Sequence, residues 1–211
     1  MSKPSDPYWA EPIGVWLWRW PAERVHNMVT PPTEISMPTA KPTYLGLLNA
    51  ISVAESEAEP LFLAWADRTK DKKLARTLRF VGMREGEHGK AFAKRMLELG
   101  YEVRPPVEAS PRAGDIEMVS SSDRTDLEKF KALGFGQGQG ETDAFDAMFS
   151  DKTIDPTTGA LLGRYIAEER DSVRLLTADY ERLAARAKAA RKRAAARKKA
   201  AKVAAAAKKP A

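Results

Sequence analysis

Apolar residues recur at helical spacing in three long stretches of the chain, which predicts an all-α protein. The first stretch begins near Tyr44, and its apolar side contains Leu47, Ile51, Ala54, Ala58, Leu61, Phe62 and Trp65. The second ends at Gly100, and its apolar stripe contains Leu74, Leu78, Val81, Phe92, Met96 and Leu99. The third begins near Pro156 and has a stripe of Leu162, Ile166, Val173, Leu176, Tyr180 and Leu183. We therefore expect three amphipathic helices, the last of which could continue toward the C-terminus.

The pattern between the second and third stretches is weaker. Residues 101–122 contain three prolines and a serine cluster, which predicts a long connection across the end of a bundle. A further helix is predicted over Asp123–Leu133, with a break at the glycine-rich segment 134–140 and a continuation over Glu141–Phe149. The glycines lack the preceding strand of a dinucleotide-binding loop, so we interpret them as a break between helices.

The N-terminal arm, residues 1–43, contains eight of the 14 prolines, a density that interrupts helices and predicts an extended segment over the bundle. An extended backbone would place Trp16, Trp18 and Trp20 on one face. The arm either packs on the core or contacts a partner or a second copy of the chain, and the sequence leaves both open. His26, which also lies in the arm, is interpreted as a surface residue.

The net charge of +6 hides two segments of opposite sign. Residues 182–211 carry 12 of the 35 basic side chains and none of the 29 acidic ones, which leaves 23 basic against 29 acidic side chains before them. The basic tail, residues 184–211, is nearly all alanine, lysine and arginine, so it favours a helix but has no apolar stripe to bury. It is either a solvated extension of the last helix or an arm that binds nucleic acid.

Composition narrows the chemistry of any site. The chain has no cysteine, which excludes disulfides, thiolate metal ligands and cysteine nucleophiles and fits a reducing compartment. Any bound metal must therefore use oxygen and imidazole ligands. No run approaches the roughly 18 apolar residues of a membrane span, so we expect a cytoplasmic protein with no membrane contact.

Two polar residues occupy core positions of the second helix. Glu85 and His88 fall in the slots that follow Val81 on the apolar stripe, and Phe92 continues it. A buried carboxylate is costly unless it is paired, hydrogen-bonded or bound to a metal, and the Glu-x-x-His spacing allows both side chains to reach one ion. On the first helix, Glu55 lies within the apolar face, whereas Glu57 and Glu59 point further away.

These segments resemble the ferritin-like, rubrerythrin-type proteins over roughly residues 44–100. The resemblance rests on Ala54-Glu55-Ser56-Glu57-Ala58 leading to Phe62 and Trp65, and on Glu85-Gly-Glu-His88 leading to Phe92. It implies an antiparallel ferritin-like four-helix bundle over residues 44–183, with one glutamate from each of two helices and one Glu-x-x-His from each of the other two. It also implies iron or manganese, a centre of up to two ions, and redox chemistry with dioxygen or peroxide.

The second half of that pattern departs from the family. The last helix has no histidine: Glu169 lies on the apolar stripe and is the better inward candidate, Glu168 lies nearer the edge, and Ser172 stands where the second histidine is expected. Glu141 is the candidate from the third helix. An asymmetric or hydrated second metal position would follow. With no cysteine for a rubredoxin-like module, electrons would come from an external donor.

Three alternatives accompany this hypothesis. Pro60 could begin a new helix, in which case Glu55 and Glu57 would be ordinary acidic residues before a helix N-terminus. The missing histidine could mean that the site no longer binds metal and that the bundle is a scaffold. The function could instead be non-enzymatic binding of nucleic acid or another polyanion through the basic tail.

Overall fold

The computed structural model describes residues 42–104, 112–136 and 151–207, with side chains described as far as residue 201. These residues form helices and no strand, in the order α1 (Leu45–Arg68), α2 (Lys72–Glu98), α3 (Arg112–Ser120), α4 (Asp126–Ala132) and α5 (Pro156–Ala207). The all-α prediction is therefore confirmed for this part of the chain. No helix within it combines the length and the apolar character that crossing a membrane requires. Residues 1–41 of the N-terminal arm lie outside the described residues.

The helix starts and stops follow local sequence signals. The Asp71 carboxylate accepts the backbone N–H groups of Lys73 and Leu74 at the start of α2, and Asp155 caps α5 in the same way. After α2 and α4, Gly100 and Gly134 adopt φ values of 83° and 86°, which are accessible to glycine at little cost. The helix α1 continues through the exposed Pro60, so the alternative in which a new helix starts there is wrong.

The short helix α3 forms inside the segment predicted to be a plain connection, so that part of the prediction is wrong. It begins at Arg112 and is held by the fully buried Val119. The Lys129 ammonium donates to the Val119 carbonyl at 2.7 Å and so joins α4 to the end of α3. Tertiary contacts of this kind decide the helix, and a proline-rich sequence does not reveal them.

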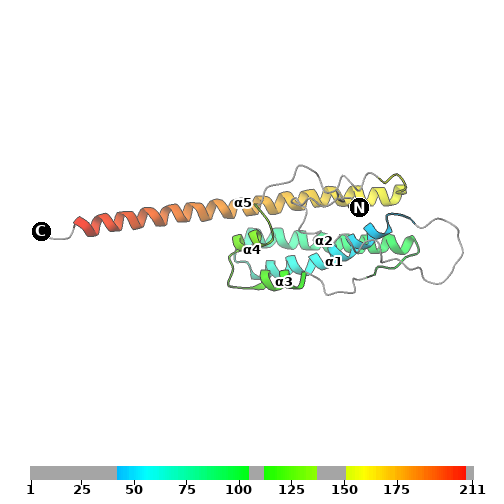
Figure 1. Cartoon of the computed structure of the whole chain (residues 1–211), viewed down its shortest axis with the longest axis horizontal. Coiled ribbons are helices and arrows are strands. Elements are labelled where there is room, and N and C mark those ends of the chain that lie inside the picture. Colours follow the sequence, from blue (N-terminus) through cyan, green and yellow to red (C-terminus); the bar gives the residue numbers. More distant parts are fainter. Residues whose placement is uncertain (1–41, 105–111, 137–150, 208–211) are drawn as a thin grey trace, which may run out of the picture.

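Two apolar clusters lie at opposite ends of the bundle, and each long helix passes through both. The first cluster contains the start of α1, the end of α2 and the start of α5, with Leu48, Phe92 and Leu162 among its members. The second contains the end of α1, the start of α2 and a later part of α5, with Trp65, Leu78 and Leu176 among its members. Consequently α1 and α5 run parallel to each other and α2 runs antiparallel to both, as Figure 1 shows.

Small residues allow α1 and α2 to approach closely. Gly82, Gly86 and Gly89 face α1, and a Cβ atom on any of them would touch an α1 residue. At Gly89, the backbone carbonyl also accepts a hydrogen bond of 2.9 Å from the Ser52 hydroxyl. The separation of the two helices, and with it the placement of Glu55 beside Glu85, therefore depends on these glycines.

We expect Gly89→Ala to destabilise the protein by about 1–3 kcal/mol, because the new Cβ atom would overlap the Ser56 hydroxyl and lie 3.0 Å from its backbone nitrogen. The matched control is Gly163→Ala in α5, where an added Cβ meets nothing within 4 Å. There the better helix propensity of alanine should stabilise the protein by roughly 0.5–1 kcal/mol. Urea unfolding of both variants checks the pair, and equal effects would contradict the close approach.

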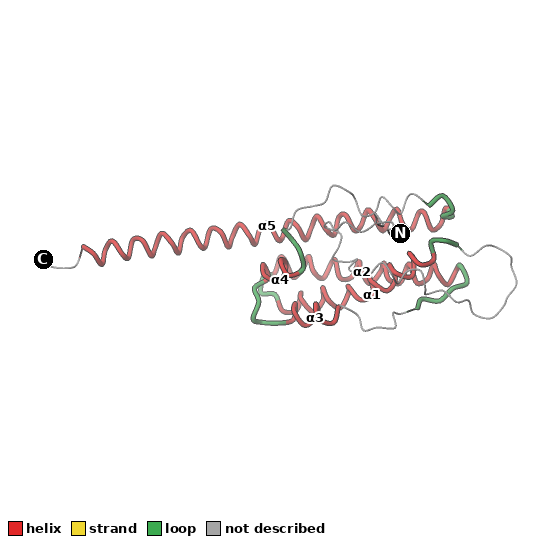
Figure 2. Tube along the Cα trace, in the orientation of Figure 1, coloured by secondary structure: helices red, strands yellow, loops and turns green. Residues whose placement is uncertain are grey.

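The helix α5 leaves the bundle at a cluster of charged residues. Arg182 donates to both carboxylate oxygens of Asp71, at 2.7 and 3.0 Å, and Arg186 donates to the same carboxylate at 2.9 Å. The Arg182 hydrogen bonds lower the pKa of Asp71 to about 2. Beyond this cluster α5 continues as a single helix that projects away from the other four (Figures 1 and 2).

Candidate metal centre

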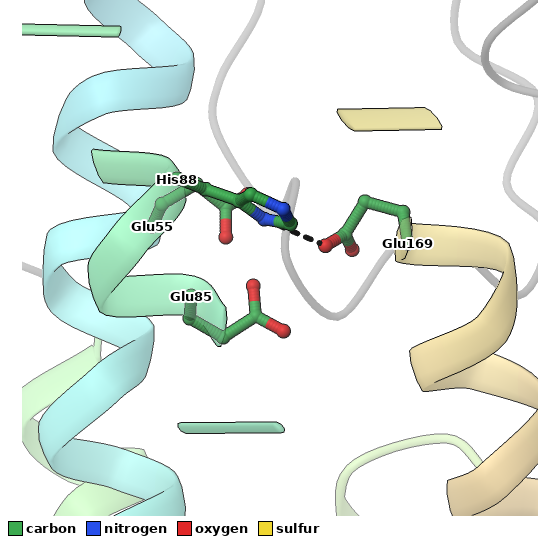
Figure 3. A group of neighbouring side chains, drawn as sticks. All are labelled: Glu55, Glu85, His88 and Glu169. Carbon is green, nitrogen blue, oxygen red and sulfur yellow. Dashed lines mark ion pairs between the residues drawn. The ribbon is translucent and has the colours of Figure 1, made fainter. Parts of the chain in front are cut away.

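The candidate centre lies between the two apolar clusters, where polar residues replace the apolar stripe on all three long helices. Glu55 comes from α1, Glu85 and His88 come from α2, and Glu169 comes from α5. The three glutamates are fully buried and His88 is 5% exposed. One ligand atom from each of the four residues lies within 4.8 Å of the others, a spacing at which all could contact one ion (Figure 3).

His88 has two different environments at its two ring nitrogens. Nε2 lies 2.7 Å from a carboxylate oxygen of Glu168, and Nδ1 lies 3.2 Å from Oε1 of Glu169, without the geometry of a hydrogen bond. An Nε2–H group that donates to Glu168 leaves Nδ1 as the nitrogen that faces the glutamates. Carboxylates in this outer position orient metal-bound histidines and raise their basicity. Glu168 therefore orients the His88 ring without itself belonging to the four-residue group.

Tyr165, which lies on α5, orients the Glu55 carboxylate. Its hydroxyl donates a hydrogen bond of 2.8 Å to Oε1 of Glu55, which leaves Oε2 of that carboxylate without a partner. The Tyr165 ring packs edge-to-face on His88, with centroids 5.0 Å apart. Burial, followed by the charges of Glu55 and Glu169, raises the pKa of Tyr165 well above its usual value, so the hydroxyl stays protonated as a donor.

Six buried polar atoms of the centre have no hydrogen-bond partner among the described residues. They are Oε2 of Glu55, both carboxylate oxygens of Glu85, both of Glu169, and Nδ1 of His88. Leaving a single buried polar atom unsatisfied costs about 1–3 kcal/mol, so six such atoms on four neighbouring residues call for a common ligand. Carboxylate oxygen and imidazole nitrogen are a donor set that suits a divalent metal ion.

Burial and the mutual charges of the centre shift the pKa values of its residues in the direction expected for an acidic cluster without a metal ion. Burial and the neighbouring Glu55 raise the pKa of Glu85 well above its usual value. Burial likewise raises the pKa of Glu169 to about 7, although His88 opposes this shift. Burial lowers the pKa of His88, but Glu169 and Glu168 outweigh it and raise that pKa. Without a metal ion, the cluster therefore holds protons near neutral pH that such an ion would displace.

Two arginines that the sequence did not single out lie near the centre. Arg84 donates to the Glu168 carbonyl at 2.8 Å and to the Ser172 hydroxyl at 3.1 Å. Arg112, the first residue of α3, is 7% exposed, and burial lowers its pKa against the opposing charges of Glu55 and Glu85. Arg84 could have been noticed because it directly precedes Glu85. Nothing in the sequence marks Arg112, because its position depends on how α3 packs against α1.

The structure thus brings together four of the six residues predicted as ligands. Glu168 is placed at the rim on the outer nitrogen of His88, in keeping with its predicted edge position. Ser172, at the position of the expected second histidine, is buried. Glu141 lies outside the described residues. Among the described residues, this is the one group of three or more acidic or histidine side chains close enough to share an ion.

Comparisons with known proteins identify no relative: no family, no curated protein and no solved structure matches this chain.

Proposed function

We propose that this chain is a ferritin-like metal-binding protein that binds iron or manganese through Glu55, Glu85, His88 and Glu169 and uses it in redox chemistry with dioxygen or peroxide. The observation that carries the proposal is the set of six buried nitrogen and oxygen atoms without a hydrogen-bond partner, on four residues from three helices whose ligand atoms lie within 4.8 Å of one another. A structural core does not need such atoms, and replacing them by apolar side chains would be favourable. Their retention is explained by a ligand.

The helix directions support the ferritin-like part of the proposal. In a simple up-down-up-down bundle, the first and the last helix run antiparallel. A single long crossover between the two helix pairs reverses the second pair, so that the first and last helices run parallel, and ferritin-like bundles have one such crossover. In this chain α1 and α5 run parallel, and the long segment between α2 and α5 provides the length for a crossover.

The residues around the centre would orient and shield a redox metal. Iron or manganese, when bound, would supply one-electron chemistry toward dioxygen or peroxide. Tyr165 fixes Glu55, Glu168 fixes His88, and the apolar clusters on either side exclude water from the ligands. Because the chain has no cysteine, it cannot hold a rubredoxin-like or iron–sulfur partner centre on thiolates, and an external donor would supply electrons.

The redox part is tested by loading the protein anaerobically with Fe(II) and then adding hydrogen peroxide or dissolved oxygen. We expect the loaded protein to oxidise Fe(II) faster than the same concentration of free Fe(II) in buffer. His88→Ala should reduce the rate toward the free value, whereas Glu87→Gln, an exposed change on the same helix, should not. A wild-type rate equal to that of free Fe(II) would refute the redox proposal and leave metal binding as a separate question.

A second candidate function, binding of nucleic acid through the basic tail, is favoured by the shape of α5. The helix is continuous to Ala207 and projects from the bundle, and every described side chain from residue 189 to 201 is exposed. Between residues 186 and 201 it carries eight lysines and arginines and no acidic residue. Phosphate contacts from such a helix would be sequence-independent and weakened by salt, because affinity comes largely from released counterions.

This second function is tested by the salt dependence of binding to duplex DNA. Replacing Arg191, Lys192 and Arg193 by glutamine keeps good helix formers in the tail but removes three charges. We expect the slope of log affinity against log salt to fall by about 0.9 for each phosphate that the variant tail no longer neutralises. The control neutralises three exposed residues of the bundle, Lys70, Lys72 and Arg76. Equal slopes for the two variants would contradict a role of the tail.

A further inference from the structure

The residues that α2 and α5 contribute to the candidate centre differ at one position. On α2, Glu85 is followed three residues later by His88, whereas on α5, Glu169 is followed three residues later by Ser172. Ser172 is 2% exposed, so it lies on the buried side of α5, as Glu169 does. A serine hydroxyl is a weak metal ligand, so α5 lacks the nitrogen donor that a second ion would use.

The Arg84 guanidinium occupies the neighbourhood of Ser172. Nη1 of Arg84 donates to the Ser172 hydroxyl at 3.1 Å, to the Glu168 carbonyl at 2.8 Å and to the Asp171 carboxylate at 3.2 Å, and Nη2 also reaches Asp171 at 3.2 Å. These four hydrogen bonds to one turn of α5 hold the guanidinium in place. The guanidinium, which forms an ion pair with Asp171, is thereby fixed beside the residue that stands in for the second histidine.

Electrostatics then disfavours a second ion. Two charges of the same sign repel far more strongly at the effective dielectric constant of a protein than in bulk water, and the double charge of a divalent ion doubles this repulsion. Arg112 adds a second buried cation whose field reaches Glu55 and Glu85. With the three buried glutamates ionised, their charge of −3 and the +2 of the two guanidinium groups leave −1, which a single divalent ion already exceeds.

We propose that the centre binds a single divalent ion through Glu55, Glu85, Nδ1 of His88 and Glu169, and that Arg84, held on Ser172, excludes a second ion from the α5 side. This inference rests on the proposed metal binding and deepens it. It replaces the two-ion centre that the family resemblance implies with a one-ion centre in which an arginine supplies fixed positive charge. Arg84 acts as a positioning and excluding residue, since it is not a ligand.

The test is the stoichiometry of Mn(II) binding, measured by equilibrium dialysis of the full chain together with electron paramagnetic resonance of the bound ion. We expect one equivalent per chain and the hyperfine pattern of an isolated Mn(II). Two equivalents, with the denser pattern of an exchange-coupled pair, would overturn the inference while supporting the proposed function. No bound Mn(II), with none of Fe(II) either, would overturn both.

A double variant tests the role of Arg84 directly. Arg84→Ala combined with Ser172→His removes the fixed charge and restores the expected nitrogen donor, so a second equivalent of Mn(II) should bind. The control is Arg174→Gln, which removes a guanidinium that also bonds Asp171 but is 70% exposed. It should leave one equivalent. A double variant that folds, as judged by its helical circular dichroism, and still binds only one ion would refute the exclusion by Arg84.

Discussion

Glu85→Met should make the metal-free protein more stable and at the same time abolish its stabilisation by metal. Both carboxylate oxygens of Glu85 are buried without a partner, so an apolar side chain of similar volume removes their desolvation penalty. We expect a gain of about 1–4 kcal/mol in the free energy of unfolding in the presence of a chelator. In the wild type, Mn(II) at about 100 times its dissociation constant should add about 2.7 kcal/mol, and in the variant it should add little.

The matched control for this prediction is Glu87→Gln. Glu87 lies two residues from Glu85 on α2 but is exposed. Its replacement should therefore change neither the free energy of unfolding with chelator nor the stabilisation by Mn(II) by more than about 0.5 kcal/mol. Urea unfolding of the three proteins, each with chelator and with Mn(II), gives the required free energies. A destabilised Glu85→Met protein without metal would show that Glu85 contributes to the fold, and the interpretation of the centre as a retained functional site would fail.

The second large effect is a pH dependence that has opposite sign in the metal-free and metal-loaded protein. The pKa of Glu169 rises from 4.5 to about 7 in the metal-free fold, so the folded state holds a proton that the unfolded chain releases between these values. The contribution of Glu169 to the free energy of unfolding of the metal-free protein is therefore fully present below about pH 4.5. It is lost, by on the order of 3 kcal/mol, as the pH rises through about 7. The raised pKa values of Glu85 and His88 act in the same direction.

With Mn(II) present the sign reverses, because the ion competes with protons for the same oxygens and nitrogen. The stabilisation by Mn(II) should increase as the pH rises through about 7, the pKa of Glu169 in the metal-free fold. Urea unfolding from about pH 5 to about pH 8, with chelator and with Mn(II), measures both curves. Asp71 does not interfere, because its lowered pKa of about 2 confines its contribution to more acidic solutions. Parallel curves for the two conditions would contradict metal binding at this group.

The residues of the centre that helical periodicity places on an apolar stripe were predictable. Glu55, Glu85 and Glu169 each interrupt such a stripe, and His88 follows Glu85 at the spacing of one turn. Periodicity is a property of each helix alone, so the apolar face can be identified without knowing what the helix packs against. For the same reason the starts of the three long helices, the ends of the first two and the break at Gly134 were predicted within a few residues of their observed positions, whereas the end of α5 at Ala207 was left open.

What the sequence did not reveal depends on contacts between helices. The hydrogen bond of Tyr165 to Glu55 and the contacts of Arg84 with α5 join residues more than 80 positions apart. No local pattern marks such pairs, although Tyr165 does lie four residues before Glu169 on the same face. The helix α3 was missed because prolines before it suggested a loop, while its stability comes from burial of Val119 and from Lys129. Tertiary packing overrides local propensity in such cases.

The most direct test of the central claim is the metal content of the purified, untagged chain, measured by elemental mass spectrometry and compared with a Glu85→Ala, His88→Ala variant. We predict about one equivalent of iron or manganese in the native chain, as purified or after anaerobic reconstitution, and its loss in the variant. A native chain that stays metal-free after reconstitution with Fe(II) and with Mn(II), or a variant that retains the metal, would contradict the assignment of this centre.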